Sequence, residues 1–336
     1  MEENEPSVRY TTLTQLLDTA ESEPLVRKTK GQIGSSGWAA IILEKQKEGT
    51  YWDNPKSCLV PKFTAGLWQL LVLADLGVSS KDPRIPKAVE HLLDLHGVDS
   101  GGFSLETKGS KEFEPHICAT GNVVRALAKM GYAEDDRVLT SLEWLISKQL
   151  PDGGWNCYAP GKHGSFSSTI QPVWALSEMM SHNARRGWET SAMKGAEFLL
   201  KHRLFKSDRN DSVVLLDYLR IHYPLHYWYD FLQGLRVLTE LGIKNDPRMN
   251  DAITLLLEKR LPDGKWNLDA VLRGWRHEHG IHAEGSVFRP EEREMVTQGW
   301  GTDRALQLEE VGKPSKWITL QALLALKRLG LFKPEH

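Results

Sequence analysis

The chain repeats three short phrases with one period, and this repetition constrains its fold more than any other feature. A turn that ends in an aromatic residue recurs at spacings of 51, 52 and 111 residues, at Trp52, Phe103, Trp155 and Trp266. Two other short motifs, or phrases, recur with the same period. One is a helix-ending pair at Gly77, Gly131 and Gly242, and the other is an acidic phrase that begins at Asp82, Asp135 and Asp246. Because the three phrases stay in register, the sequence predicts a repeat of roughly 50 to 55 residues.

Each unit is predicted to hold two helices. The acidic phrase suits a helix start, because Asp caps free N–H groups and Pro is tolerated at the first helical position. An amphipathic segment follows, as at 142–146, and the glycine-aromatic turn then reverses the chain. The second helix is apolar along most of its length, as at 67–73, which indicates a buried helix. A left-handed glycine ends it.

Five such pairs and a helical lead-in at 7–30 predict one all-α domain over 1–336, with repeats at about 31–330. Repeated α-hairpins form either an open solenoid or a closed ring. We favour the ring, with the inner helices around a central cavity. An insertion at about 268–312 interrupts the last unit, and we interpret it as a loop or a lid.

Composition excludes several classes of protein. The net charge of −2 lacks the basic surplus of a nucleic-acid binder. Three widely spaced cysteines do not form a disulfide framework, and no secretory signal precedes the repeats. The longest apolar stretch, 67–78, is too short and too polar to span a bilayer. We therefore expect a cytoplasmic protein.

One turn resembles a known motif. The segment 148–155, Lys-Gln-Leu-Pro-Asp-Gly-Gly-Trp, is similar to the Gln-x-x-Asp-Gly-x-Trp motif of squalene and hopene cyclases, and 258–266 is a weaker copy with Arg260 in place of Gln. The stretch 101–120 resembles repeats of protein prenyltransferase β subunits. The resemblance covers about residues 31–330 and implies the (α/α)6 toroid of the terpenoid cyclase and protein prenyltransferase superfamily. In that superfamily the motif ties helix ends together and reports architecture more than activity.

The catalytic Asp-x-Asp-Asp motif of class II cyclases is missing. The nearest run is 208–211, Asp-Arg-Asn-Asp, in which Asn210 stands where the acid belongs. An amide cannot protonate an alkene, so we interpret this run as a charged loop.

The starts of the inner helices should surround one mouth of the ring, where the positive ends of the helix dipoles favour anions. We expect Asp230 to be a buried general acid, with Tyr229 and His226 beside it as further catalytic candidates. The alternative for Asp230 is a structural carboxylate bonded to a helix start. The predicted ligand-binding residues are Lys62, Phe63, His116, Cys118, Trp228, Lys316 and Trp317.

Metal binding is the less favoured expectation. We predict no cofactor, although His116 and Cys118 could supply two zinc ligands, with Asp230 or His163 as a third. The zinc pattern of protein prenyltransferases does not match position by position. A histidine-rich run at 277–284 completes no standard motif.

Three functions stay open. The first is binding or conversion of an isoprenoid or another hydrophobic ligand in an aromatic cavity, whose polar rim of Lys62, His116, His226 and Lys316 would suit a diphosphate. The second is a carbohydrate-active toroid, which needs a second carboxylate near Asp230 across an open groove. The third is a non-catalytic scaffold. Membrane-surface association has no supporting segment, and a helical partner subunit can be neither assigned nor excluded.

Overall fold

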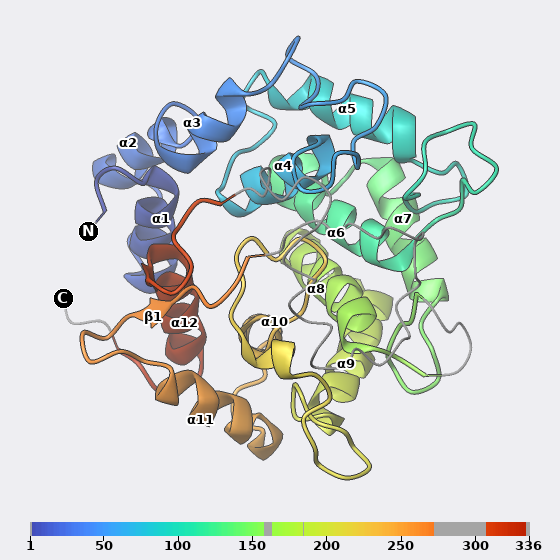
Figure 1. Cartoon of the computed structure of the whole chain (residues 1–336). Coiled ribbons are helices and arrows are strands. Elements are labelled where there is room, and N and C mark those ends of the chain that lie inside the picture. The colour runs from blue at the N-terminus through green and yellow to red at the C-terminus, as the bar shows by residue number, and fades with distance from the viewer. Residues whose placement is uncertain (1, 158–162, 184, 272–306, 334–336) are drawn as a thin grey trace.

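The computed structural model describes residues 2–157, 163–183, 185–271 and 307–333, and it is mostly helical, as the repeats predict (Figure 1). The α-helices of this part are α1 Pro6–Thr11, α2 Pro24–Gln32, α3 Gly37–Glu44, α4 Gly66–Asp75, α5 Ile85–His96, α6 Ile117–Leu127, α7 Asp136–Ser147, α8 Phe166–His182, α9 Arg186–Lys201, α10 Phe231–Glu240, α11 Asn250–Glu258 and α12 Lys316–Arg328. Short π- or 3₁₀-helical turns are η1 Thr12–Leu16, η2 Ala128–Tyr132, η3 Leu216–Leu219 and η4 Pro247–Met249. The strands β1 Trp266–Asn267 and β2 Pro314–Ser315 pair antiparallel.

The helices alternate between buried and amphipathic, as expected. Helices α4, α6 and α10 are buried along nearly their whole length, whereas α5, α7 and α11 bury one face. Figure 1 shows α4, α6, α8 and α10 toward the middle and α3, α5, α7, α9 and α11 outside them. Consecutive inner helices pack on one another, from α4 through α6, α8 and α10 to α12. Each hairpin therefore buries its inner helix between the neighbouring hairpins.

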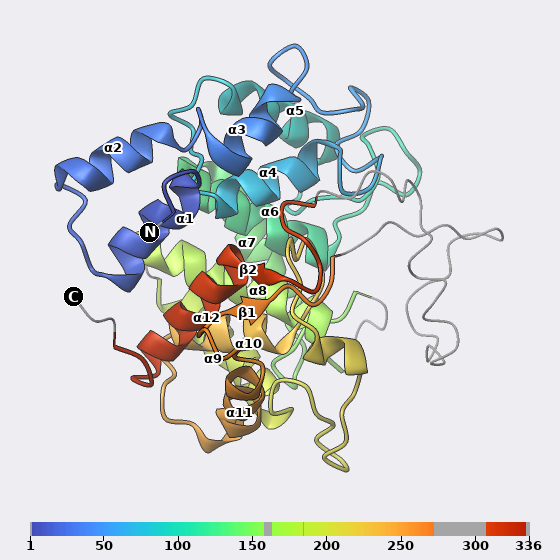
Figure 2. The ribbon, with the colours of Figure 1, turned by 60° about the vertical axis from the view of Figure 1, so that its left-hand side comes forward.

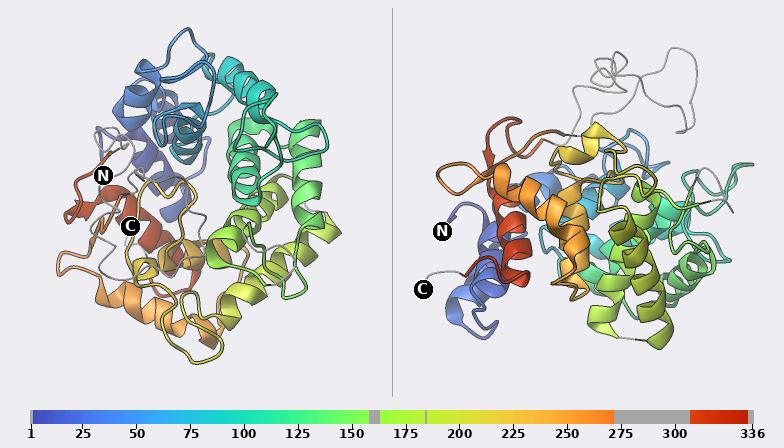
Figure 3. Two further views of the ribbon diagram at one scale, coloured as in Figure 1. Left: turned by 45° about the vertical axis from the view of Figure 1, so that its right-hand side comes forward. Right: turned by 90° about the horizontal axis from the view of Figure 1, so that it is seen from below.

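The two ends of the chain are neighbours. Helix α12 packs against α1 and η1, and both ends lie on the same side of the molecule (Figures 2 and 3). Lys327 Nζ donates to the carbonyl of Gln15 at 2.8 Å and pairs with Asp18 at 2.7 Å, while Lys316 Nζ pairs with Glu2 at 2.8 Å. The lead-in thus lies beside the last inner helix, and its first helix begins at Pro6.

The repeated turns make a repeated hydrogen bond. The indole N–H of each turn tryptophan donates to the carbonyl ten residues earlier, in the preceding outer helix: Trp52 to Ile42, Trp155 to Leu145 and Trp266 to Leu256, at 2.7 to 2.8 Å. Phe103 occupies the same position in its unit, but its side chain has no N–H to donate. The aromatic residue therefore fixes the turn to the outer helix and fills the space beneath it.

The same turns are tied to the following inner helix. The backbone N–H of Phe103, Trp155 and Trp266 donates to the hydroxyl of the fourth residue of that helix, at 2.8 to 3.1 Å, namely Thr120, Thr169 and Thr319. The glycines that were predicted to end the inner helices all have positive φ, at 84°, 100°, 84° and 74° for Gly77, Gly131, Gly242 and Gly330.

The acidic phrases join neighbouring units as well as starting helices. In each, the carboxylate accepts the backbone N–H of the arginine two residues later and pairs with its guanidinium, as Asp135 does with Arg137. The arginine then reaches the preceding unit, where Arg84 donates to the Gly34 carbonyl, and Arg137 and Arg248 pair with Glu90 and Glu197. Loss of one such exposed pair costs little, but the repeated contacts set the register between units.

Candidate functional site

The segment 221–230, between η3 and α10, runs through the middle of the molecule (Figure 1). It carries four of the predicted site residues; Lys62 and Phe63 lie in the turn before α4, which begins at Gly66 rather than at the predicted start near Pro61, and the others lie at the starts of α6 and α12. The structure separates the predicted set into three groups, around His226, around Asp230 and around Cys118.

The first group is an aromatic cluster of four rings, made by Phe63, Trp68, His226 and Tyr227. Phe63 stacks on His226 with centroids 4.7 Å apart and planes at 14°. Trp68 meets both rings edge-on at 5.3 and 5.4 Å. Lys62 Nζ lies 4.7 Å from the centroid of Tyr227 and 5.5 Å from that of Phe63. The structure thus brings Lys62, Phe63 and His226 together with Trp68 and Tyr227, whereas His116 and Lys316 of the predicted rim have other contacts.

The stacked pair is strained and buried. Phe63 and His226 have φ of 66° and 48°, a left-handed conformation that is unfavourable for residues with a side chain. Burial lowers the pKa of His226 to about 3, so its imidazole is neutral at physiological pH. Its Nδ1 is buried and has no hydrogen-bond partner within the described residues. Local strain and an unpaired buried nitrogen in one place are typical of a functional site.

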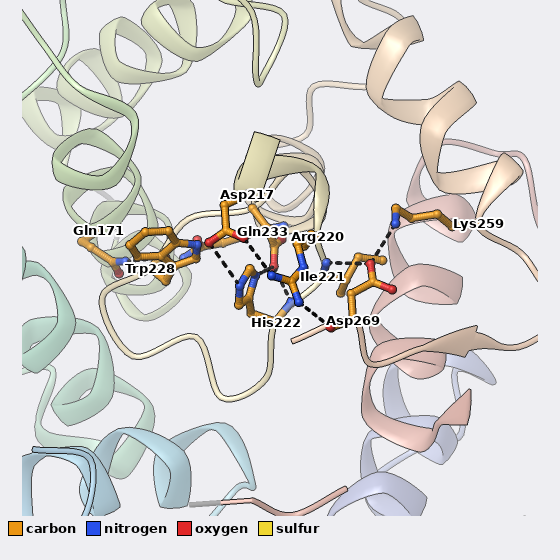
Figure 4. A network of polar contacts seen from close by, with 10 residues as sticks. Gln171, Asp217, Arg220, Ile221, His222, Trp228, Gln233, Lys259 and Asp269 are labelled. Atoms are coloured by element: carbon orange, nitrogen blue, oxygen red, sulfur yellow. Dashed lines mark hydrogen bonds and ion pairs between the residues drawn. The ribbon is translucent and has the colours of Figure 1, made fainter. Parts of the chain in front are cut away.

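The second group centres on Asp230, which is 1% exposed and precedes α10 as its N-cap. Its carboxylate accepts the backbone N–H of Gln233 at 2.8 Å and that of His222 at 2.9 Å. The His222 ring lies between two carboxylates, with Nδ1 3.7 Å from Asp230 and Nε2 3.9 Å from Asp217 (Figure 4). Asp230 therefore has the bonds of a cap, the structural alternative that the sequence left open, and its catalytic role stays a prediction.

A polar network fixes the chain around His222 (Figure 4). Asp269 accepts the backbone N–H of Ile221 at 2.9 Å and an N–H of Lys259 at 2.8 Å. Arg220 pairs with Asp217 at 3.2 Å and donates to the Asp269 carbonyl at 3.1 Å. These contacts link the segment before α10 to the end of α11 and to the chain after β1.

A void of about 10 Å³ lies beside Asp230, which is room for roughly one water molecule. Polar side chains line it together with Trp317 and with Tyr223, which stacks on Trp317 at 5.0 Å. Several buried polar atoms of the lining residues lack a hydrogen-bond partner among the described residues: Tyr223 Oη, His222 Nδ1 and both side-chain amide atoms of Gln233. Trp228 Nε1, two residues before Asp230, lacks one as well. This conformation therefore leaves no room for a large ligand beside Asp230.

The remaining predicted site residues near the starts of the inner helices make contacts within the fold. Tyr229 packs on Phe166 and Tyr218, and its hydroxyl donates to the Leu204 carbonyl. Burial raises the pKa of Tyr229 well above its usual value. The Trp228 carbonyl accepts from Gln171 at 3.4 Å. Lys316 contacts Glu2 and is partly exposed.

The third group, the cysteine cluster, consists of His116, Cys118 and Cys157. The three ligand atoms lie within 4.8 Å of one another, with the two sulfurs 3.0 Å apart and Cys157 Sγ 3.9 Å from His116 Nδ1. The hydrogen bond from Cys118, aided by His116 and Ser168, lowers the pKa of Cys157 to about 4 against the effect of burial. Neither Asp230 nor His163 belongs to this group, and Cys157 is the third member that sequence reasoning missed.

The opposite ends of the inner helices hold a different network. Arg125 pairs with Asp75 at 2.6 Å, and its guanidinium lies 3.9 Å from the ring of Trp174, which Arg236 approaches at 4.9 Å. Trp174 Nε1 donates to Glu240 at 3.0 Å. Burial would raise the pKa of Asp75, but Arg125 and other cations lower it to about 2. Cations here suit the negative ends of helices.

Two further predictions have different outcomes. The run 208–211 is an exposed turn, in which Asp211 pairs with Lys206 and Arg203, so its interpretation as a charged loop is confirmed. The histidine run 277–284 and most of the predicted lid at 268–312 lie outside the described residues. No helix in the described part of the chain combines the length and apolarity that crossing a bilayer requires.

Comparison with known proteins gives matches among solved structures. No protein-family model and no curated protein matches the chain. The type II terpene cyclase MstE from Scytonema, without ligand, is 16% identical over 97% of this chain and 89% of that chain, with a TM-score of 0.45. A variant of MstE in complex with its substrate geranylgeranyl dihydroxybenzoate is 15% identical over 98% and 88%, with a TM-score of 0.46. At these identities and scores, the similarity does not assign the activity or the ligand of MstE to this chain.

Proposed function

We propose that the chain is an (α/α)6 toroid that binds an isoprenoid or a similar hydrophobic ligand with an anionic end at its aromatic cluster. The observation that carries this proposal is the stack of Phe63 on His226 with Trp68 at its edge and Lys62 above Tyr227. Aromatic rings pack against the apolar chain of an isoprenoid, their faces attract any positive charge on it, and an ammonium at their border attracts an anion. The contacts of α12 with α1 and η1 support ring closure.

Ligand entry requires a rearrangement of the segment 221–228. The void beside Asp230 holds about one water molecule, so an isoprenoid chain must displace side chains of this segment. The strained backbone at His226 and the unpaired polar atoms of Tyr223 and Trp228 make this segment the least satisfied part of the interior. Its displacement would give those atoms new partners.

If the ligand is converted, we assign proton transfer at the cluster to His226, whose neutral ring has an unpaired nitrogen. Asp230 and Tyr229 stay predicted catalytic residues, and Asp230→Asn and Tyr229→Phe test them. The bonds that both side chains make in this conformation are structural. A cytoplasmic location likewise stays a prediction.

The test is quenching of tryptophan fluorescence by geranylgeranyl diphosphate, compared with geranylgeraniol and with inorganic pyrophosphate. We expect saturable binding of the diphosphate, weaker binding of the alcohol, and a loss of at least about tenfold in Trp68→Leu. Trp144→Leu is the matched control, because it makes the same substitution on outer helix α7, outside the aromatic cluster. Equal losses in both variants, or no saturable binding, would contradict the proposal.

The small void favours a second candidate, the non-catalytic scaffold. A chain that binds none of these probes, with unchanged stability in their presence, would support it. The carbohydrate-active alternative has a second carboxylate near Asp230, namely Asp217 on the other side of His222. Asp230 is buried, however, and does not face an open groove in the described structure.

A further inference from the structure

The start of α6 lacks the side-chain cap that three of the other inner helices have, as does α4, which follows Ala65. Helices α8, α10 and α12 begin after Ser165, Asp230 and Ser315, and each of these side chains accepts the N–H of the third residue after it. Helix α6 begins after His116, whose side chain makes no such capping bond. Ser and Asp are among the best N-cap residues, so His at this place gives up helix stability. The His116 ring instead faces Cys157.

Both cysteines lie at positions that the repeat does not fix. Cys118 is the second residue of α6, where α4 and α10 have Leu67 and Leu232, and α8 and α12 have Ser167 and Trp317. Cys157 lies two residues after its turn aromatic, where the other units have Asn54, Leu105 and Leu268. The repeat therefore does not require a thiol at either place, and the two thiols and the His116 imidazole meet at one interface.

The three donors match a soft divalent cation. Thiolates and imidazole are the preferred ligands of zinc, and two thiolates neutralise a dipositive ion in a buried place. Cys118 is 7% exposed. A tetrahedral zinc site with Zn–S bonds of about 2.3 Å needs sulfurs roughly 3.8 Å apart. The present 3.0 Å between the two sulfurs would have to open by less than a bond length, a change that side-chain rotation supplies.

We propose that His116, Cys118 and Cys157 form a zinc site between the starts of α6 and α8, with a fourth coordination position left to a ligand from outside this group. The proposal is independent of isoprenoid binding. The frame that holds the donors is rigid: the Cys157 N–H donates to Ser168 Oγ in α8 at 3.1 Å, and a Cβ on Gly121 of α6 would lie 2.8 Å from the Gln171 backbone of α8. Such close helix packing keeps the three donors together.

Binding has a defined proton balance. A thiol that becomes a ligand loses its proton to solvent, so each zinc that binds releases up to two protons, and no electron is transferred. Oxidation of the two thiols to a disulfide is a different reaction, which needs an external oxidant and removes both sulfurs as ligands. The two outcomes therefore exclude each other on the same molecule.

The test uses the full chain, purified under reducing conditions and stripped of metal. Cobalt(II) serves as the spectroscopic probe, because thiolate ligation gives an intense charge-transfer band and a tetrahedral site gives strong visible bands. We expect one cobalt per chain, displacement by one zinc, and protection of Cys118 and Cys157 from alkylation. The third cysteine, Cys58, is the internal control: it is buried, lies outside the group, and its pKa is raised to about 12.

Variants assign the ligands. We expect Cys118→Ser and Cys157→Ser each to weaken zinc binding by more than roughly 100-fold, the upper end of what a residue outside the ligand shell costs. His116→Ala should weaken it similarly, and Cys58→Ala should not change it. If a variant fails to fold, the unmodified chain still tests the proposal, because bound metal should protect Cys118 and Cys157 from alkylation.

Three results would overturn the proposal. One is a fully reduced chain that takes up no cobalt or zinc. Another is a cobalt spectrum that survives both cysteine substitutions and is lost when His277, His279 and His282 are replaced by alanine. The third is a Cys118–Cys157 disulfide in the isolated protein whose reduction restores no metal binding.

Discussion

The two ends of the inner helices are built from different chemistry. At the carboxyl ends, cations meet carboxylates: Arg125 pairs with Asp75, Arg328 with Glu240, and Trp174 lies between two guanidinium groups. At the amino ends lie rings, thiols and imidazoles, several with buried atoms that lack partners among the described residues. Cations at the carboxyl ends complement the helix dipoles and neutralise the carboxylates there, although Arg125 Nε and Arg328 Nη1 also lack a hydrogen-bond partner among the described residues. The amino ends contain uncharged rings whose buried polar atoms cost stability without such a pairing.

We expect this difference to separate residues that stabilise the fold from residues that take part in the proposed binding. A buried ion pair that joins neighbouring inner helices holds the units together, and its loss should be felt as unfolding. A strained histidine stacked on a strained phenylalanine does not improve the fold, so its substitution should affect binding more than stability. The following substitutions test this division.

The largest effect is expected for Arg125→Leu. Asp75 would keep its buried place without its closest cation, and breaking a buried pair on one side costs about 3 to 5 kcal/mol. The free energy of unfolding in urea measures it. The double variant Asp75→Leu/Arg125→Leu is the control and should recover most of the loss, because the buried carboxylate is removed with the arginine, and Lys129, which also pairs with Asp75 at 3.5 Å, is partly exposed to water. A single variant within about 1 kcal/mol of the unmodified chain would contradict the structural role of this end, because that loss is well below the cost of an uncompensated buried charge.

An acid-dependent effect is expected for His226→Phe. The folded pKa of His226, about 3, lies below its unfolded value, so the unfolded state binds the extra proton between these values. Stability should therefore fall as the pH is lowered from about 6.5, by at most roughly 1.4 kcal/mol per pH unit from this residue.

Urea unfolding between pH 7 and pH 4.5 checks this effect. His226→Phe should have a shallower pH dependence with nearly unchanged stability at pH 7. A slope should remain, because burial also lowers the pKa of His96, to about 4. An unchanged slope in the variant would show that His226 is solvated or protonated in the folded chain.

A smaller effect is expected for Trp155→Phe. This substitution compares the contribution of a repeated turn to stability with the contributions of the two helix ends. The change removes the bond from Nε1 to the Leu145 carbonyl, which keeps the backbone N–H of Lys148 as its other donor, so the cost should be that of one hydrogen bond, about 0.5 to 1.5 kcal/mol. Thermal unfolding measures it. Because Phe103 occupies the same place in its own unit without this bond, a loss below about 0.5 kcal/mol would mean that the ring alone holds the turn, since one hydrogen bond contributes at least that much.

The sequence predicted the architecture because the architecture is repetitive. Turn aromatics, helix-ending glycines and acidic caps each recur. Each has the same local role in every unit, so its role can be predicted from the sequence of one unit. What the sequence did not reveal is how these residues join units, such as the reach of Arg137 to Glu90 or the hydroxyl of Thr169 under Trp155. Those contacts depend on the packing between hairpins.

The site was harder to predict, because helix starts alone do not say which side chains meet. His222 was missed since it precedes α10 by a full loop, and it becomes visible only when that loop folds between Asp217 and Asp230. Cys157 offered only a weak signal: it follows a turn at a position where two other units have leucine and the unit of Trp52 has Asn54. It also precedes α8, which begins at Phe166, so a search restricted to helix starts does not reach it.

The smallest effect on stability, and the most specific test of the amino ends, is Lys62→Met. Methionine keeps the length of the side chain and removes the charge above Tyr227 and Phe63, which should cost about 0.5 to 1 kcal/mol. Binding should respond more strongly: affinity for geranylgeranyl diphosphate should fall, and affinity for geranylgeraniol should stay. Lys148→Met removes the same kind of contact on an outer helix and should change neither. If Lys62→Met lowered the affinity for the alcohol and the diphosphate alike, Lys62 would shape the cluster rather than attract an anion.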